Sequence, residues 1–130
     1  MSQTAEGIKK VGILTTLIRN GNLNKNTILF IDEPETNLHP LAVFELVKML
    51  FELSNAGVQI FLATHSYFVV KQFELLARRH DESVQLTSLI RQEKAISLAS
   101  DSLLNGMPEN LLIDASIRQY EESVRLDIQG

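Results

Sequence analysis

Two short apolar runs joined by a long amphipathic segment constrain this fold more than any other feature. Residues 27–31 and 58–63 are mostly apolar and partly β-branched, and they lack polar alternation, which is typical of strands covered on both faces by helices. Between them, residues 40–55 have the apolar spacing of a helix, with one stripe made of Val43, Leu46, Val47, Leu50 and Leu53. Because parallel strands need a crossover connection, this order predicts an α/β fold with a parallel sheet and flanking helices.

Weaker patterns predict the remaining elements. Helical spacing predicts helices over residues 6–19 and 67–79. Residues 84–91 and 95–99 flank a polar triplet, which indicates a β-hairpin near the end of the chain. A loop is expected over residues 101–108, followed by a terminal helix with a stripe of Ile113, Ile117, Tyr120 and Val124.

The composition argues against several functional classes. The net charge is −4 and the twelve basic residues are scattered, so no Lys/Arg stripe is present to neutralise a phosphate backbone. We therefore expect nucleic acid to bind only through regions outside this chain. The chain has no cysteine, which excludes disulfides, zinc–thiolate sites and thiol nucleophiles and agrees with a reducing cytoplasm. Without a signal-peptide pattern or a long apolar stretch, a cytoplasmic protein with no membrane partner is expected.

Charged residues follow both apolar runs at the point where each strand should end. Asp32 and Glu33 come directly after the first run, and Pro34 stops that strand because it lacks an N–H for the sheet. The second run leads to His65. The carboxyl ends of parallel strands share one edge, where open α/β sheets bind ligands, so we expect these three side chains to converge there. The simpler interpretation is that the carboxylates mark a strand end and that His65 caps the next helix.

The order of these motifs resembles the second half of an ATP-binding cassette (ABC) ATPase head of the SMC- and RecF-like type, related to the OLD-family ATPases. Residues 28–33 look like the Walker B strand, the string Asn37-Leu38-His39-Pro40 looks like the D-loop, and His65 looks like the H-loop histidine. Ala5-Glu6-Gly7 resembles a degenerate signature motif, which begins with serine in many relatives. The resemblance is specific from about residue 4 to residue 66. It implies the C-terminal lobe of a P-loop NTPase fold.

The resemblance also implies ATP and Mg²⁺ as cofactors. Asp32 is then the residue that holds the metal and its water shell. Glu33 is implied to polarise the attacking water as general base, and His65 to donate a hydrogen bond to the γ-phosphate. Partial burial and the neighbouring charge are expected to raise the pKa of Glu33. The residues implied to contact nucleotide across a nucleotide-dependent head dimer are Ala5, Glu6, Gly7, Asn37 and His39.

Simpler interpretations of the flanking motifs stay open. Free N–H groups at the start of the first helix suit an anion, but Thr4 can also be an ordinary N-cap and Lys9-Lys10 a solvated helix face. Asn37 can cap the helix that Pro40 begins.

The P-loop itself is missing from these residues. A P-loop requires Gly-x-x-x-x-Gly-Lys-Ser/Thr, and no Gly-Lys dipeptide occurs in the chain. We therefore expect residues 1–130 to form a single, partial domain that needs a P-loop-bearing segment or chain and hydrolyses no ATP alone. Two alternatives remain: a regulatory or interaction module of the same fold without hydrolysis, and a metal-dependent nuclease or phosphatase that uses Asp32, Glu33 and Glu35 as ligands.

Overall fold

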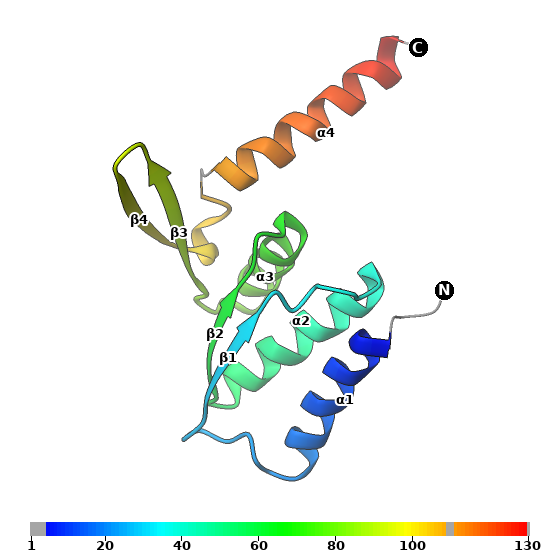
Figure 1. The fold of residues 1–130 in the computed structure, drawn as a ribbon, viewed down its shortest axis with the longest axis vertical. Helices are drawn as coiled ribbons and strands as arrows, with labels where there is room; N and C mark the ends of the chain where they lie inside the picture. The colour runs from blue at the N-terminus through cyan, green and yellow to red at the C-terminus, as the bar shows by residue number, and fades with distance from the viewer. Residues whose placement is uncertain (1–4, 109–110, 130) are drawn as a thin grey trace. The chain divides into compact units, whose positions relative to one another are not determined.

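Helices and strands alternate along the first part of the chain, and a hairpin and a helix follow (Figure 1). The computed structural model describes residues 5–108 and 111–129. Its elements are α1 (Ala5–Arg19), β1 (Ile28–Asp32), α2 (Pro40–Asn55), β2 (Gln59–Ala63), α3 (Tyr67–His80), β3 (Gln85–Gln92), β4 (Ala95–Ser102), the 3₁₀ helix η1 (Leu103–Asn105) and α4 (Leu111–Gln129). Within the described ranges, no helix combines the length and the apolar character needed to cross a membrane.

The predicted parallel pair is confirmed. β1 and β2 form a two-stranded parallel sheet in which Ile28 lies opposite Gln59 and Asp32 lies opposite Ala63. Figure 1 shows both arrows pointing the same way, with α2 as the crossover. The α/β fold class is therefore established, and both strands deliver their carboxyl ends to one edge.

The crossover helix α2 has the predicted bounds because both of its ends are specified locally. At its start, His39 Nδ1 accepts a hydrogen bond from Leu41 N at 3.3 Å, and Pro40 is the first helical residue. At its end, Gly57 takes a φ of +104°, a conformation that a side chain would strain. The predicted N-cap, Asn37, is thus wrong, since His39 makes the capping bond.

The predicted apolar stripe of α2 forms the core of the first part of the chain. Val43, Leu46, Val47 and Leu50 are buried, and Leu53 is half-buried. Phe51, Val58, Val69 and Val70 are also buried.

One face of the β1–β2 sheet is open among the described residues, contrary to the expectation of strands covered on both faces. Ile28 is 55% exposed and Phe30 is 75% exposed. Phe30 stacks on its cross-strand neighbour Phe61 with ring centroids 5.1 Å apart. The lack of polar alternation shows that both faces of the sheet are apolar. It does not show whether helices within this stretch of chain cover both faces.

The chain divides into two compact units, Met1–Gln72 and Phe73–Gly130, and α3 spans the division. In the second unit β3 and β4 form the predicted antiparallel hairpin, with Gln85 opposite Ser102. Leu76, Ala77 and Leu103 are buried there.

Two predictions for the second unit need adjustment. The loop expected over residues 101–108 begins too early, because pairing with Gln85 extends β4 to Ser102 and the Ser102 side chain then caps η1 by accepting from Leu104 N. The terminal helix is confirmed as α4. In its predicted stripe Tyr120 is 72% exposed, while the side chains of Ile113 and Ile117 lie outside those described.

Candidate functional site

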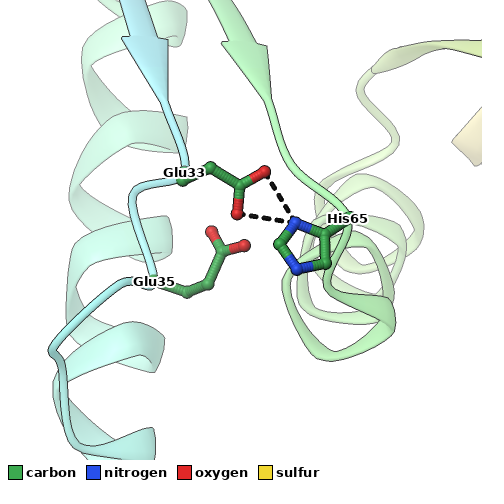
Figure 2. A group of neighbouring side chains, drawn as sticks. All are labelled: Glu33, Glu35 and His65. Carbon is green, nitrogen blue, oxygen red and sulfur yellow. Dashed lines mark hydrogen bonds and ion pairs between the residues drawn. The ribbon is translucent and has the colours of Figure 1, made fainter.

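The site lies where β1 and β2 end side by side. Asp32 is the last residue of β1, opposite Ala63, and the sheet pairing continues one residue further because Glu33 N donates to Ala63 O at 2.8 Å. His65 follows two residues after the end of β2. Figure 2 shows Glu33 and His65 facing each other from the two strand ends. The parallel crossover thus brings together residues that are 32 positions apart.

Glu33 and His65 form a hydrogen-bonded pair, which is an ion pair when His65 is protonated. His65 Nδ1 lies 2.7 Å from Oε1 and 2.7 Å from Oε2 of Glu33. The hydrogen bond from His65 lowers the pKa of Glu33, and Glu33 in turn raises the pKa of His65. The expectation of a raised pKa for Glu33 was therefore wrong. A charge-assisted hydrogen bond outweighs desolvation in this position, because the Glu33 side chain remains 31% exposed.

Glu35 is the third member of this cluster. Its Oε1 accepts a hydrogen bond from Thr64 Oγ1 at 2.7 Å, while its Oε2 is buried with no hydrogen-bond partner. Ligand atoms of Glu33, Glu35 and His65 all lie within 4.8 Å of one another. From the sequence, Glu35 had a role only in the nuclease or phosphatase alternative. The spacing of Glu33 and Glu35 on either side of Pro34 could have predicted that both carboxylates lie on the same side of the turn.

The turn after β1 that carries these carboxylates has an unusual backbone conformation. Glu33 has a φ of +49°, which is uncommon for a residue with a side chain. The Glu33 carbonyl accepts hydrogen bonds from Thr36 N at 3.1 Å and from Lys10 Nζ at 3.2 Å. Lys10 also donates to the Thr36 carbonyl at 3.2 Å, so this lysine clamps the turn from α1. No sequence spacing pointed to that contact, since Lys10 was interpreted as part of a solvated face.

Ser66, rather than His65, makes the contact expected of a cap for α3. Ser66 Oγ accepts a hydrogen bond from Val69 N at 3.4 Å, and Ser66 N donates to Thr64 Oγ1 at 3.0 Å. His65 is left 84% exposed and pairs with Glu33. The capping interpretation of His65 is therefore wrong.

The other predicted site residues are not members of this cluster. Asp32 is exposed at the end of β1 and is not part of the group formed with Glu35. Its carboxylate is a hard oxygen donor at a strand end, a chemistry that fits Mg²⁺ held through water. Asn37 lies in the turn with a φ of +63°. Ala5, Glu6 and Gly7 open α1, with side chains outside those described, and Thr4 lies outside the described residues.

Fold and site together define an α/β domain with charged residues at the carboxyl edge of a parallel pair, the class in which nucleotide-binding ATPases fall. Residues 1–71 match a family described as "AAA domain, putative AbiEii toxin, Type IV TA system". This match covers more than half of the 130 residues, and the chain belongs to that AAA-domain family. Membership supports an ATPase-type, nucleotide-binding function in general terms.

A curated relative adds a local similarity. A stretch of 41 residues, 32% of this chain, is 49% identical to the Old nuclease of Escherichia phage P2. The stretch amounts to 7% of that protein, so the chain spans less than a tenth of the relative's length. No solved structure matches the chain.

Proposed function

We propose that this chain is the hydrolytic lobe of an ABC-type ATPase head of the SMC- and RecF-like type, related to the OLD-family ATPases. In this proposal β1 is the Walker B strand, residues 37–40 are the D-loop and His65 is the H-loop histidine. One observation carries the proposal. Glu33 and His65 pair at 2.7 Å across two parallel strand ends, which is the place where a base and a phosphate-sensing group have to meet.

The Glu33–His65 pair also suggests how the site is controlled. While His65 donates to Glu33, the carboxylate is ionised, but its basicity is low. His65 is 84% exposed and has room to turn toward a γ-phosphate oxygen. Transfer of its hydrogen bond from Glu33 to that oxygen stabilises charge in the transition state. The same movement frees Glu33 to accept a proton from water.

The remaining residues have positioning roles in this proposal. Asp32 holds Mg²⁺, which neutralises charge on the transferred phosphoryl group when it is bound. Asn37 and His39 contact a second head, and the start of α1, at Ala5-Glu6-Gly7, offers its N–H groups and positive dipole end to the partner's γ-phosphate. Lys10 clamps the turn that carries Glu33.

The test is reconstitution with a P-loop-bearing segment or chain encoded in frame or in an adjacent gene. We expect ATP hydrolysis after mixing the two pieces, little or none from this chain alone, and loss in the variants Asp32→Ala, Glu33→Gln and His65→Ala. Strong turnover by the chain alone, abolished by Glu33→Gln, would contradict the half-site proposal.

The same measurements distinguish the two alternatives. Nucleotide-dependent association with the P-loop piece that is insensitive to Glu33→Gln would favour a regulatory module. Metal-dependent cleavage of DNA by this chain alone would favour a nuclease.

A further inference from the structure

We propose that Glu33, Glu35 and His65 form a binding site for a divalent transition-metal ion such as Mn²⁺ or Zn²⁺, separate from the Mg²⁺ assigned to Asp32. Each residue offers one ligand atom, and these atoms lie within 4.8 Å of one another. In Figure 2 the two carboxylates and the imidazole are turned toward a common centre. Two carboxylate oxygens and one imidazole nitrogen are a common donor set for such ions.

The buried oxygen of Glu35 is the independent observation that points to a ligand. Oε2 of Glu35 is buried without a hydrogen-bond partner, a state that is unfavourable for a carboxylate. The side chain is not free to turn this atom outward, because Oε1 is held by Thr64 Oγ1 at 2.7 Å. A cation bound among the three residues supplies the missing partner.

The charge of the group favours a divalent cation. Lys10 is near this turn, but its described hydrogen bonds go to the backbone carbonyls of Glu33 and Thr36 rather than to a carboxylate. Among the described contacts of Glu33 and Glu35, His65 is the positive partner. One imidazolium balances one carboxylate, whereas a divalent ion balances both.

The nitrogen donor sets the class of ion. Mg²⁺ and Ca²⁺ prefer oxygen ligands throughout, whereas Mn²⁺ and Zn²⁺ accept imidazole together with carboxylate. Ligands bound at about 2.1 Å lie at most about 4.2 Å apart. A group that spans up to 4.8 Å therefore closes through small side-chain rotations, and His65 is exposed enough to make them.

Metal binding has a consequence for the proposed ATPase, and this consequence rests on the proposed function. An ion held by Glu33 and His65 withdraws both the base and the γ-phosphate donor. Mn²⁺ or Zn²⁺ at this site would then inhibit turnover that Mg²⁺ supports through Asp32. Metal binding itself requires no nucleotide, so the metal site and the proposed ATPase function can be tested independently.

The test is calorimetric titration of the full chain with Mn²⁺ and with Zn²⁺ in nucleotide-free, chelator-treated buffer. We expect one equivalent of either ion to bind, with affinity at least about tenfold weaker in Glu35→Gln and in His65→Gln. Glu93→Gln and His80→Gln, at a carboxylate and an imidazole elsewhere in the chain, serve as matched controls and should bind like the parent. Binding that survives both site variants, or that falls equally in the controls, would overturn the proposal.

Two further measurements protect this conclusion. Circular dichroism checks that Glu35→Gln folds, and His65→Gln tests the site at an exposed position where folding is not at risk. Bound Mn²⁺ should broaden the NMR signals of the His65 imidazole but not those of His80. A tenfold excess of Mg²⁺ should leave Mn²⁺ bound, and displacement at equal concentrations would refute the role of the nitrogen donor.

Discussion

The two strand pairs of this protein differ in what they bring together. β1 and β2 are parallel and joined by a helix, so residues 32 positions apart meet at one edge. β3 and β4 are antiparallel, and their cross-strand pairs run from Gln92 and Ala95 to Gln85 and Ser102. Within the described part of the chain, only the parallel pair brings together a group of side chains that could hold a metal ion.

Both pairs nevertheless expose apolar side chains. Phe30 and Phe61 lie on the open face of the parallel pair, and Leu89, Ile96 and Leu98 are exposed on the hairpin. Exposed apolar surface is therefore no guide to where the chemistry lies. What distinguishes the first unit is its topology, because a crossover places polar strand ends side by side. If this difference matters, substitutions in the first unit should have larger effects than matched substitutions in the hairpin.

The largest contrast is expected in catalysis. Removing a general base typically costs about 10²- to 10⁴-fold in rate, so Glu33→Gln should lower kcat of the reconstituted ATPase by this factor. Glu93→Gln removes an exposed carboxylate between the strands of the hairpin and should leave kcat unchanged. Steady-state hydrolysis by the mixed pieces measures both. Equal losses in the two variants would erase the distinction between the strand pairs.

Core packing should give the next largest contrast. Leu50 in α2 is 1% exposed, whereas Leu98 in β4 is 67% exposed. Leu50→Ala should lower the free energy of unfolding by about 2–5 kcal/mol, and Leu98→Ala by no more than about 0.5 kcal/mol. Urea denaturation followed by circular dichroism checks both values. A large loss from Leu98→Ala would show that the open face of the hairpin is packed in solution.

These contrasts parallel what was predictable from the sequence. The bounds of α2 were predicted because a long stripe, a proline start and a glycine after the end agree. The meeting of Glu33 and His65 followed from the handedness and direction of a parallel crossover. Both inferences use features that repeat along the chain or that topology enforces.

What was missed depends on individual dihedral angles. Glu33 has a positive φ in the turn that brings its carboxylate together with Glu35 and His65, and no residue pattern encodes that angle. The pKa of Glu33 was predicted in the wrong direction for the same reason. The hydrogen bond from His65 lowers this pKa by more than burial raises it. The Lys10 clamp was missed because it joins elements 23 residues apart through one flexible side chain.

A hydrogen-bond comparison sharpens the division at a smaller scale. Thr64 Oγ1 bonds to Glu35 and accepts from Ser66 N, whereas Thr87 in the hairpin bonds only to the exposed Ser100 hydroxyl at 2.9 Å among its described side-chain contacts. Thr64→Val leaves both carboxylate oxygens of Glu35 without a partner and should cost about 1–3 kcal/mol of stability. In Thr87→Val the Ser100 hydroxyl can still hydrogen-bond to water, so stability should change by less than about 0.5 kcal/mol. Thermal and urea unfolding of the two matched variants compare them directly, and equal effects would mean that the Glu35 contact is not formed.

The smallest expected effect is the titration of His65 itself, because the Glu33–His65 pair is largely exposed and solvent screens it. The raised pKa of His65 means that its contribution to stability is complete below the ordinary histidine pKa and is lost as pH rises through the folded value. The lowered pKa of Glu33 means that its contribution is complete above the ordinary glutamate pKa and is lost as pH falls through the folded value. The pair therefore acts between these two folded values. An NMR titration in metal-free buffer should find the pKa of His65 above its usual range in the parent and returned toward it in Glu33→Gln. An unchanged His65 pKa in that variant would show that Glu33 and His65 do not pair in solution. The clearest difference between the two strand pairs would then be lost.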